Sequence, residues 1–430
     1  MKVDVAIIGA GAAGLAAARA LSGAGKRVCI LEARDRVGGR ISTLHVPDLP
    51  VPIELGAEFI HGQSETTFPI VDAAALTVVR LPDDHQWIRN GRREPLTNYW
   101  GTMQRVTSKI RTLRRDIPFA EFLRRQKSLD AHTCELARTF VEGYHAAHIE
   151  RMSALALRSA DTEQDDSDNP QFRIVNGQDS LIAFLRTGLD PHRTDLRLGT
   201  VVTDVQWSPG AVTLRCRSTN AERRTSIVQA RAVVITIPIG VWKAPHEQDG
   251  AIRFDPVLTE KEHAISKLET GHVVKIAFRF RERFWDDDGK GPSFLHSSDR
   301  FVPTWWTMKP LRAPILTAWS GGHSADALLA EGRDAMIDRA LDAMANAWGV
   351  PRKRIDTLLV GAFTHDWQSD PFSRGAYSYA GVGGSGMHAL LAKPMKKTLF
   401  FAGEATNTEE TGTVSGAIAS GLRAAKEVLR

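Results

Sequence analysis

Hydrophobic residues near the start of the chain form two short runs separated by a glycine-rich segment. The first run, residues 3–9, leads into Gly9-Ala10-Gly11-Ala12-Ala13-Gly14, where a helical pattern begins, and the second, residues 27–31, ends at Glu32. Short apolar runs of this kind predict buried strands, and the glycines permit a tight turn from strand to helix. The first forty residues therefore predict a β-α-β unit.

The pattern alternates between strands and helices along the rest of the chain. Residues 197–207 and 211–217 predict two strands of a hairpin that turns at Ser208-Pro209-Gly210. Further strands are predicted at 232–237, 271–280 and 398–401, and helices at 103–115, 119–125, 334–348 and 415–429. A parallel strand-helix arrangement followed by mixed segments predicts an α/β fold.

The glycine motif and Glu32 have the spacing of a dinucleotide site. The glycines let the backbone approach a pyrophosphate, the helix N-terminus offers N–H groups to it, and Glu32 accepts hydrogen bonds from the ribose. An acid at this position favours FAD or NAD over NADP. The segment Arg36-Val37-Gly38-Gly39-Arg40 favours FAD, because the longer cofactor needs a second close backbone approach and a phosphate-facing Arg40 suits it. The alternative for Gly38-Gly39 is an ordinary loop.

Composition fits a large enzyme of two domains. The chain has 430 residues, 43% of them hydrophobic and 24% charged. Three irregularly spaced cysteines argue against disulfides and a zinc site and predict a reducing, cytoplasmic location. The formal charge is +5, but the basic clusters are interpreted as solvated helix faces. We expect no metal, no nucleic acid and no membrane partner.

Several motifs taken in order resemble the flavin-containing amine oxidase family, which includes monoamine oxidases, polyamine oxidases and flavin-dependent histone demethylases. They are Gly9 to Gly14, Arg36 to Arg40, Leu55 to Gly62, and Phe401 to Glu404 with Gly416-Ala417. The resemblance implies a discontinuous, Rossmann-type FAD-binding domain interleaved with an α+β substrate-binding domain. The expected boundaries are 1–72, 175–255 and 370–430 for the FAD domain, and 73–174 and 256–369 for the substrate domain.

The resemblance also implies which residues contact FAD. Val202 matches the position whose backbone meets the adenine, Glu404 matches the acid on the ribityl chain, and the last helix points its N-terminus at the flavin, which favours negative charge there. The full expected set is Gly9, Gly11, Ala13, Gly14, Glu32, Ala33, Arg34, Gly38, Gly39, Arg40, Gly56, Ala57, Glu58, Phe59, Val202, Trp367, Gly403, Glu404, Gly412, Thr413 and Val414.

Four residues are expected to act on the substrate: Lys275, Tyr377, Thr413 and His61. Strand alternation alone places Lys275 on a solvent-facing side, but it resembles the family lysine that holds a water against the flavin. Tyr377 resembles an aromatic wall of the substrate pocket. His61 is interpreted either as a tunnel residue or as a structural histidine.

Two positions depart from the monoamine oxidase pattern. Ala376 stands where those enzymes carry the cysteine that tethers FAD, so FAD is expected to bind without a covalent link. Thr413 stands where a second tyrosine is expected, which favours a polyamine, diamine or bulky amine over a simple arylalkylamine.

The implied reaction transfers a hydride from the carbon next to the amine nitrogen to flavin N5. The imine hydrolyses to an aldehyde and an amine or ammonia, and O₂ becomes H₂O₂. Alternatives are an amino-acid oxidase, a carbon–carbon desaturase, or a non-enzymatic FAD-binding recognition protein. Acidic residues within 161–168 are either a solvated loop, which we favour, or an attractor for polycations. We expect a monomer or homodimer.

Overall fold

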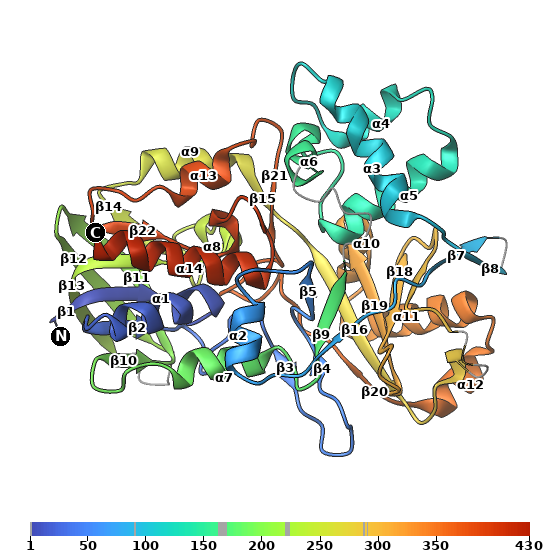
Figure 1. Ribbon diagram of the computed structural model, residues 1–430, viewed down its shortest axis with the longest axis horizontal. Coiled ribbons are helices and arrows are strands. Elements are labelled where there is room, and N and C mark those ends of the chain that lie inside the picture. Colours follow the sequence, from blue (N-terminus) through green and yellow to red (C-terminus); the bar gives the residue numbers. More distant parts are fainter. Residues whose placement is uncertain (1, 90–91, 162–169, 220–223, 287–288, 290) are drawn as a thin grey trace.

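One large sheet, on the left of Figure 1, gathers strands from separated parts of the chain. The computed structural model describes residues 2–89, 92–161, 170–219, 224–286, 289 and 291–430. The sheet order is β10-β2-β1-β13-β12-β11-β14, with β22 also paired to β13. The strands are β1 (Lys2–Ile8), β2 (Val28–Leu31), β10 (Thr194–Arg197), β11 (Thr200–Ser208), β12 (Ala211–Ser218), β13 (Thr225–Ile235), β14 (Arg253–Asp255) and β22 (Leu399–Phe401).

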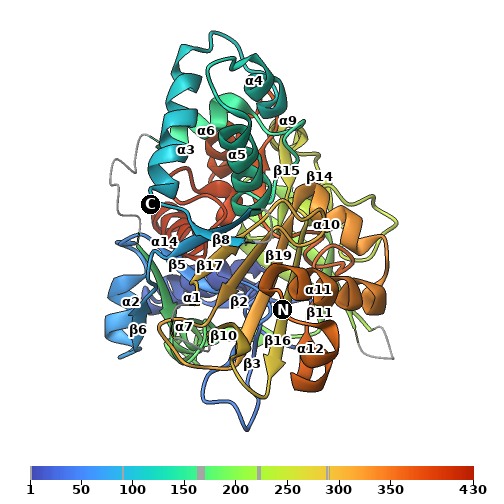
Figure 2. The ribbon, with the colours of Figure 1, turned by 90° about the vertical axis from the view of Figure 1, so that its right-hand side faces the viewer.

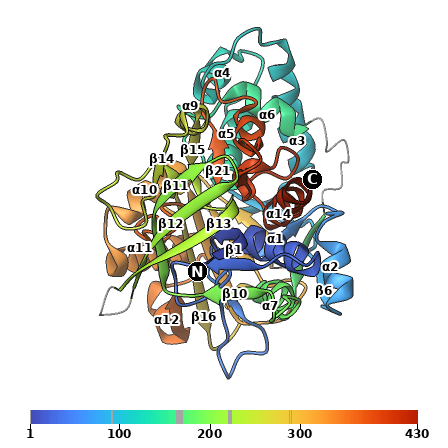
Figure 3. The same ribbon diagram turned by 90° about the vertical axis from the view of Figure 1, so that its left-hand side faces the viewer.

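Strands β10, β2, β1, β13 and β22 are parallel, whereas β11, β12 and β13 form an antiparallel meander. Helices α1 (Ala12–Gly23), α7 (Asp179–Thr187) and α14 (Val414–Leu429) cover one face of the parallel strands and share an apolar core with them. Figure 3 shows α1 and α14 lying together. Their contact depends on Gly421, because a Cβ there would lie 2.2 Å from the carbonyl oxygen of Ala13. The first and last helices of the chain therefore pack against each other.

A second large sheet lies on the opposite side, in the order β20-β16-β19-β18-β17-β7-β8. Figure 2 shows helices α10 (Gly322–Leu329), α11 (Arg333–Trp348) and α12 (Arg352–Leu358) beside it, and their apolar residues form one core with β16. The strands are β7 (His85–Arg89), β8 (Arg92–Pro95), β16 (Val273–Phe280), β17 (Phe294–His296), β18 (Thr304–Thr307), β19 (Ile315–Gly321) and β20 (Leu359–Phe363).

A helical part with its own apolar core lies above the second sheet in Figure 1. It contains α3 (Tyr99–Ser108), a 3₁₀ turn (Lys109–Thr112), α4 (Phe119–Arg125), α5 (Ala131–Tyr144) and α6 (Ala154–Asp161). Short strand pairs connect the parts: β3 (Thr43–Leu44) with β4 (Ile53–Glu54), β15 (Leu268–Thr270) with β21 (Ser378–Ala380), and β5 (Phe59–His61) and β6 (Val78–Arg80) with β9 (Gln171–Ile174). The other helices are α2 (Phe68–Ala73), α8 (Ile239–Trp242), α9 (Thr259–Lys267) and α13 (Met387–Ala392), with 3₁₀ turns at Phe284–Asp286 and Glu404–Thr406.

The expected α/β fold is confirmed, and three element boundaries need correction. Strand β13 begins at Thr225, well before the predicted 232, because its first half pairs with β12 and is largely exposed. Arg197, predicted as the start of the hairpin, is instead the last residue of the separate strand β10, and the hairpin strand β11 begins at Thr200. The helix predicted at 103–115 corresponds to α3 followed by a 3₁₀ turn, and this turn ends at residue 112. The domain boundaries themselves stay a prediction. In the described part of the chain, every helix is too short or too polar to cross a bilayer.

Candidate active site

A cavity of about 1130 Å³ is lined by residues of both large sheets and of the helical part. This is larger than the roughly 300–1,000 Å³ of an ordinary ligand pocket. All the residues predicted to contact cofactor or substrate line it, with Gly14 as the exception. The cavity therefore joins positions from residue 9 to residue 414 that are distant in the sequence.

The glycine-rich turn forms one end of the cavity and fits a dinucleotide phosphate. Gly9 has φ +103°, a conformation that side-chain-bearing residues rarely adopt. Gly11 caps α1 without any side-chain hydrogen bond, so the first N–H groups of that helix are left for a ligand. Glu32 is buried there, and its carboxylate accepts hydrogen bonds from the backbone N–H of Ala10 at 2.7 Å and of Arg34 at 2.9 Å. These contacts orient the acid at the end of β2.

Gly14 serves packing rather than ligand contact, since it does not border the cavity. A Cβ at Gly14 would lie 2.0 Å from the carbonyl oxygen of Gly9, and 3.4 Å from the side chain of Ile7. Only glycine lets α1 lie this close to β1. The prediction that Gly14 contacts the cofactor directly is corrected to this indirect role.

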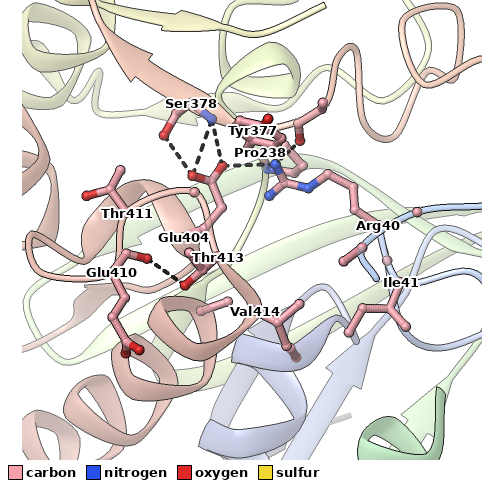
Figure 4. Close-up of a pocket in the computed structure, with 18 of the residues that line it drawn as sticks. Arg40, Ile41, Pro238, Tyr377, Ser378, Glu404, Glu410, Thr411, Thr413 and Val414 are labelled. Carbon is pink, nitrogen blue, oxygen red and sulfur yellow. Dashed lines mark hydrogen bonds and ion pairs between the residues drawn. The ribbon is translucent and has the colours of Figure 1, made fainter. Parts of the chain in front are cut away.

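Arg40, Glu404 and Ser378 form a polar cluster in the cavity wall (Figure 4). Arg40 Nη1 donates to Glu404 Oε1 at 2.9 Å and also to the carbonyl oxygen of Ala376. Glu404 also accepts from the hydroxyl of Ser378 at 2.7 Å. Its Nη1 is thus engaged by Glu404 and a backbone carbonyl, and the expected contact of Arg40 with a phosphate stays a prediction.

Arg34 is also tied to protein groups. Its Nη2 lies 2.7 Å from Asp370 Oδ2 and donates to Ser373 Oγ at 2.7 Å. Burial alone would raise the pKa of Asp370, but hydrogen bonds from His365 and Arg34 hold it well below its usual value. Arg34 thus connects the end of β2 to the 370–373 loop, and its cofactor contact stays a prediction.

The expected flavin-side residues also line the cavity. Trp367 is buried, and its indole N–H donates to the carbonyl of Leu55 at 3.0 Å. Gly56 lies under it: a Cβ there would be 1.9 Å from the carbonyl oxygen of Arg40 and 3.1 Å from the Trp367 ring. The other predicted positions on the cavity wall are Ala13, Ala33, Gly38, Gly39, Ala57, Val202, Gly403, Gly412 and Val414.

Thr413 borders the cavity where α14 begins, but its hydroxyl is engaged by the backbone. The Oγ1 atom accepts from the N–H of Gly416 at 2.9 Å and donates to the carbonyl of Glu410 at 2.7 Å (Figure 4). Thr413 is therefore the N-cap of α14. This capping role was not predicted and adds to the expected substrate contact.

Lys275 is buried, with 3% of its surface exposed, which corrects the solvent-facing position that alternation predicted. Strand β16 lies between β19 and β20 in the sheet. The faces alternate as expected, because Val274, Ile276 and Phe278 pack into the core. The opposite face, with Lys275, meets the cavity instead of solvent.

Two acceptors fix the Lys275 ammonium. Its nitrogen lies 2.7 Å from Glu58 Oε2 and donates to the carbonyl oxygen of Gly56 at 3.0 Å. It also lies 5.6 Å from the centre of the Trp306 ring, within cation–π range. A lysine has three N–H donors, so one remains for a water or substrate in the cavity beyond these two acceptors.

Glu58 is bound on several sides by protein groups, and its expected contact with the cofactor stays a prediction. Its Oε1 accepts from Arg173 Nη2 at 2.7 Å, and its Oε2 accepts from the Trp306 indole N–H at 3.1 Å. Its carboxylate therefore forms ion pairs with Lys275 and Arg173. Burial raises the pKa of the nearby Glu54 to about 7, although Lys275 opposes this rise.

His61 and Tyr377 lie in an aromatic region of the cavity with Tyr144. The His61 ring contacts Tyr144 edge-on at 5.5 Å, and the Tyr377 hydroxyl donates to the Tyr144 carbonyl at 2.8 Å. Burial lowers the pKa of His61 to about 4, so its ring is neutral near pH 7. Its Nδ1 atom is buried without a protein partner. A neutral imidazole with a free nitrogen suits contact with a bound molecule.

Sequence reasoning missed much of this aromatic wall. Tyr99, Trp100, Tyr144, Phe294, Trp306 and Trp319 all line the cavity. It also missed a buried pair, His85 and His296, whose Nδ1 and Nε2 atoms lie 2.9 Å apart. Phe59, predicted to contact the cofactor, packs edge-on against Trp306 in this wall. Aromatic residues on β17, β18 and β19 were visible as a composition signal, but nothing in their spacing distinguished wall from core.

The fold and the cavity define a dinucleotide-binding protein with an adjoining aromatic chamber. Residues 12–429 match the family described as flavin containing amine oxidoreductase. The chain therefore belongs to that family, and FAD is its cofactor.

Individual proteins resemble the chain over nearly its whole length. It is 27% identical to lysine-specific histone demethylase 1 homolog 2 of Arabidopsis thaliana, over 99% of this chain but only 58% of that protein. It is 29% identical to polyamine oxidase 3 of Oryza sativa subsp. japonica, over 98% of this chain and 88% of that one. The structure of putrescine oxidase bound to putrescine has a similar fold, with TM-score 0.83 and 22% identity, over 100% of this chain and 99% of the other.

Proposed function

We propose that this protein is an FAD-dependent amine oxidase. The substrate loses a hydride from the carbon next to nitrogen, and the resulting imine reacts with water to give an aldehyde and an amine or ammonia. The observation that carries the proposal is the buried Lys275, fixed on the cavity wall by Glu58 and the Gly56 carbonyl. When bound, FAD supplies the hydride acceptor and the place where O₂ is reduced to hydrogen peroxide.

The protein's own contribution is to position groups and exclude water. Lys275 directs its remaining N–H at a water or at the reacting part of the substrate, because its other donors are used. Residues Gly56 and Trp367 shape the wall beside it. The N-terminus of α14, capped by Thr413, places a positive dipole end at the cavity, where it stabilises negative charge.

The aromatic chamber favours the uncharged amine, which is the form with a lone pair able to drive hydride loss. Tyr144 and Tyr377 are partly buried. Burial raises the pKa of both hydroxyls, that of Tyr144 to about 12, so both side chains are neutral near pH 7. His61 is neutral for the same reason. An environment of neutral rings disfavours an ammonium by desolvation, which lowers the pKa of the bound amine.

We infer that the substrate is a diamine, a polyamine or a bulky amine. Thr413 leaves more room than the second tyrosine expected in monoamine oxidases. Three carboxylates, Glu65, Glu409 and Glu410, also line the cavity and suit a second cationic group of the substrate. Burial and the charges of Glu409 and Glu65 raise the pKa of Glu410. A polyamine oxidase among the relatives supports the same class.

The acidic stretch 161–168 gives no support to this substrate class. Asp161 ends α6, and residues 162–168 lie outside the described residues. The interpretation as a solvated loop stays a prediction, as do the cytoplasmic location, the absence of nucleic acid and membrane partners, and the monomeric or dimeric state.

We propose that FAD binds without a covalent link. Ala376 lies on the cavity wall and has no reactive side-chain atom. Among the described residues that line the cavity there is no cysteine, and burial raises the pKa of Cys29 to about 12 and of Cys216 to about 11. Acid precipitation should therefore release all of the yellow flavin into the supernatant. Flavin that stays with the pellet would contradict this.

A peroxide assay on purified flavoprotein tests the function. Diamines and polyamines should produce H₂O₂ faster than arylalkylamines, and Glu410→Gln should slow a diamine more than a monoamine of equal length. Peroxide from amino acids alone would indicate an amino-acid oxidase instead. A yellow protein that no amine reduces would indicate a recognition protein or a desaturase.

A further inference from the structure

A second cluster of chemically reactive side chains lies outside the cavity, where α10 begins. His323 and Asp326 are three residues apart on α10 and so share one face of that helix. His148 comes from the segment between α5 and α6, and His272 directly precedes β16. None of these four borders the cavity within the described chain.

The side chains of this cluster are in close contact. His148 Nε2 lies 2.6 Å from Asp326 Oδ2, and His272 Nδ1 lies 2.6 Å from the other oxygen, Oδ1. The His148 ring is 4.9 Å from that of His323 in an edge-on arrangement. His148, His323 and Asp326 each offer one ligand atom, and these atoms lie within 4.8 Å of one another.

We propose that His148, His323 and Asp326 bind a divalent transition-metal cation, with Zn²⁺ as the best match. Two imidazoles and one carboxylate are a donor set that Zn²⁺ accepts, with water completing the coordination. Zn²⁺ ligands lie at about 2.0–2.2 Å from the metal, so binding draws the three ligand atoms together. The half-exposed side chains of His323 and Asp326 have the freedom to make this movement.

The surrounding groups resemble the outer shell of a metal site. Glu150 Oε2 lies 2.6 Å from His323 Nε2, which leaves Nδ1 of that ring as its remaining nitrogen. His272 holds the second oxygen of Asp326 in the same way. Carboxylates and other partners that orient metal ligands are a regular feature of such sites.

Two buried atoms of this cluster have no hydrogen-bond partner in the described chain. They are Nδ1 of His148, whose side chain is 4% exposed, and Oε1 of Glu142. That oxygen lies 3.9 Å from His323 Nε2. Buried polar atoms without partners are rare in native proteins and need an explanation. A cation coordinated by Nδ1 of His148 would give that nitrogen a partner, and it would add positive charge beside Glu142.

The position of the cluster gives the cation a structural role. The segment before His148 contains Gly143, Tyr144 and His145, which line the cavity. The backbone N–H of His148 also donates to the Tyr379 hydroxyl at 3.4 Å, and Tyr379 lines the cavity too. A cation shared by His148 and α10 therefore fastens this wall of the chamber to the second sheet.

Calorimetric titration of Zn²⁺ into tag-free, FAD-loaded protein that has been treated with chelator tests the proposal. The wild type should bind one Zn²⁺ per chain and unfold at a higher temperature with Zn²⁺ present. His323→Ala and Asp326→Asn should lose this binding and the shift. His272→Gln should weaken binding by about 10–100-fold, the usual effect of losing an outer-shell partner. The exposed His246 provides a matched control, and His246→Ala should behave as wild type.

Flavin absorbance and circular dichroism establish that each variant is folded, and the readout does not depend on catalytic activity. Mg²⁺, which prefers oxygen ligands, should not replace Zn²⁺. The proposal is overturned if the wild type binds no Zn²⁺. It is equally overturned if folded His323→Ala and Asp326→Asn bind Zn²⁺ as tightly as the wild type does.

Discussion

The ammonium nitrogen of Lys275 lies 2.7 Å from Oε2 of Glu58, and both side chains are more than nine-tenths buried. Burial alone would raise the pKa of Glu58, but Lys275 and Arg173 outweigh this and hold that pKa below its usual value. Arg173 and Trp306 fix the carboxylate from its other sides. Glu58 is therefore the anchor that sets where the lysine points.

Glu58→Gln should slow amine oxidation and destabilise the protein. Removing one partner of a buried ion pair costs about 3–5 kcal/mol, because the remaining charge is uncompensated. Lys275→Met added to this variant should restore part of the free energy of unfolding, since the unpaired lysine is then gone. Urea unfolding of both single variants and the double variant measures this coupling. Simple addition of the two single effects would rule out a direct interaction.

Thr413 gives a prediction that separates capping from substrate contact. Thr413→Ala should lower the free energy of unfolding by about 1 kcal/mol, within the roughly 0.5–2 kcal/mol range for loss of an N-cap. Thr413→Ser keeps the hydroxyl that accepts from Gly416, so its stability should remain near that of the wild type. Equal losses in the two variants would show that the hydroxyl does not cap α14.

Gly14 and Gly23 lie on the same helix and should respond in opposite ways. Gly14→Ala places a methyl group 2.0 Å from the Gly9 carbonyl, so it should cost about 1–3 kcal/mol and reduce the bound flavin per chain. Gly23→Ala meets no atom within 4 Å and should be neutral or stabilising. Thermal unfolding and flavin content of the purified variants provide the comparison. Normal flavin content in Gly14→Ala would contradict the packing argument.

Two partly buried histidines predict how stability depends on pH. Burial lowers the pKa values of His61 and His145 from 6.5 to about 4. A lowered folded-state pKa contributes stability above pH 6.5 that is lost as the pH falls towards 4. Relative to a His61→Gln/His145→Gln variant, the wild type should lose up to about 1.4 kcal/mol per pH unit for each histidine.

The comparison with this double variant is necessary because other groups act in the opposite direction. Burial raises the pKa values of Glu54 and Glu142 to about 7, so the stability they contribute is lost as the pH rises towards 7. Urea unfolding at several pH values between 4 and 7 measures the difference. A wild-type and variant difference that does not change with pH would show that the histidines titrate normally.

Local patterns predicted the parts of the site that depend on neighbouring residues. The Gly9 to Gly14 turn and Glu32 follow from spacing within one β-α-β unit, and they lie where that unit requires. Alternation along β16 also assigned the two faces of the strand correctly. It placed Lys275 in solvent because a strand pattern contains no information about what covers a polar face.

Contacts between distant segments were beyond prediction from the sequence. The Glu58 and Lys275 pair joins residues more than two hundred positions apart, as does the contact between Tyr377 and Tyr144. The ion pairs of Arg40 with Glu404 and of Arg34 with Asp370 were not predicted, because each joins residues more than three hundred positions apart. Tyr144 ends α5, a helix that was not predicted.

We propose that Lys275 acts in amine oxidation inside this cavity. The most direct test is the rate at which a diamine bleaches the flavin absorbance under anaerobic conditions, followed by its return when O₂ is added. Lys275→Met should stay yellow but slow reduction or reoxidation by about 10²-fold or more, the scale of a positioned proton-transfer group. Lys261→Met provides a matched control, because Lys261 is also buried but binds the carbonyls of Leu390 and Lys393 outside the cavity. It should keep wild-type rates, whereas unchanged kinetics in Lys275→Met would show that Lys275 takes no part in amine oxidation.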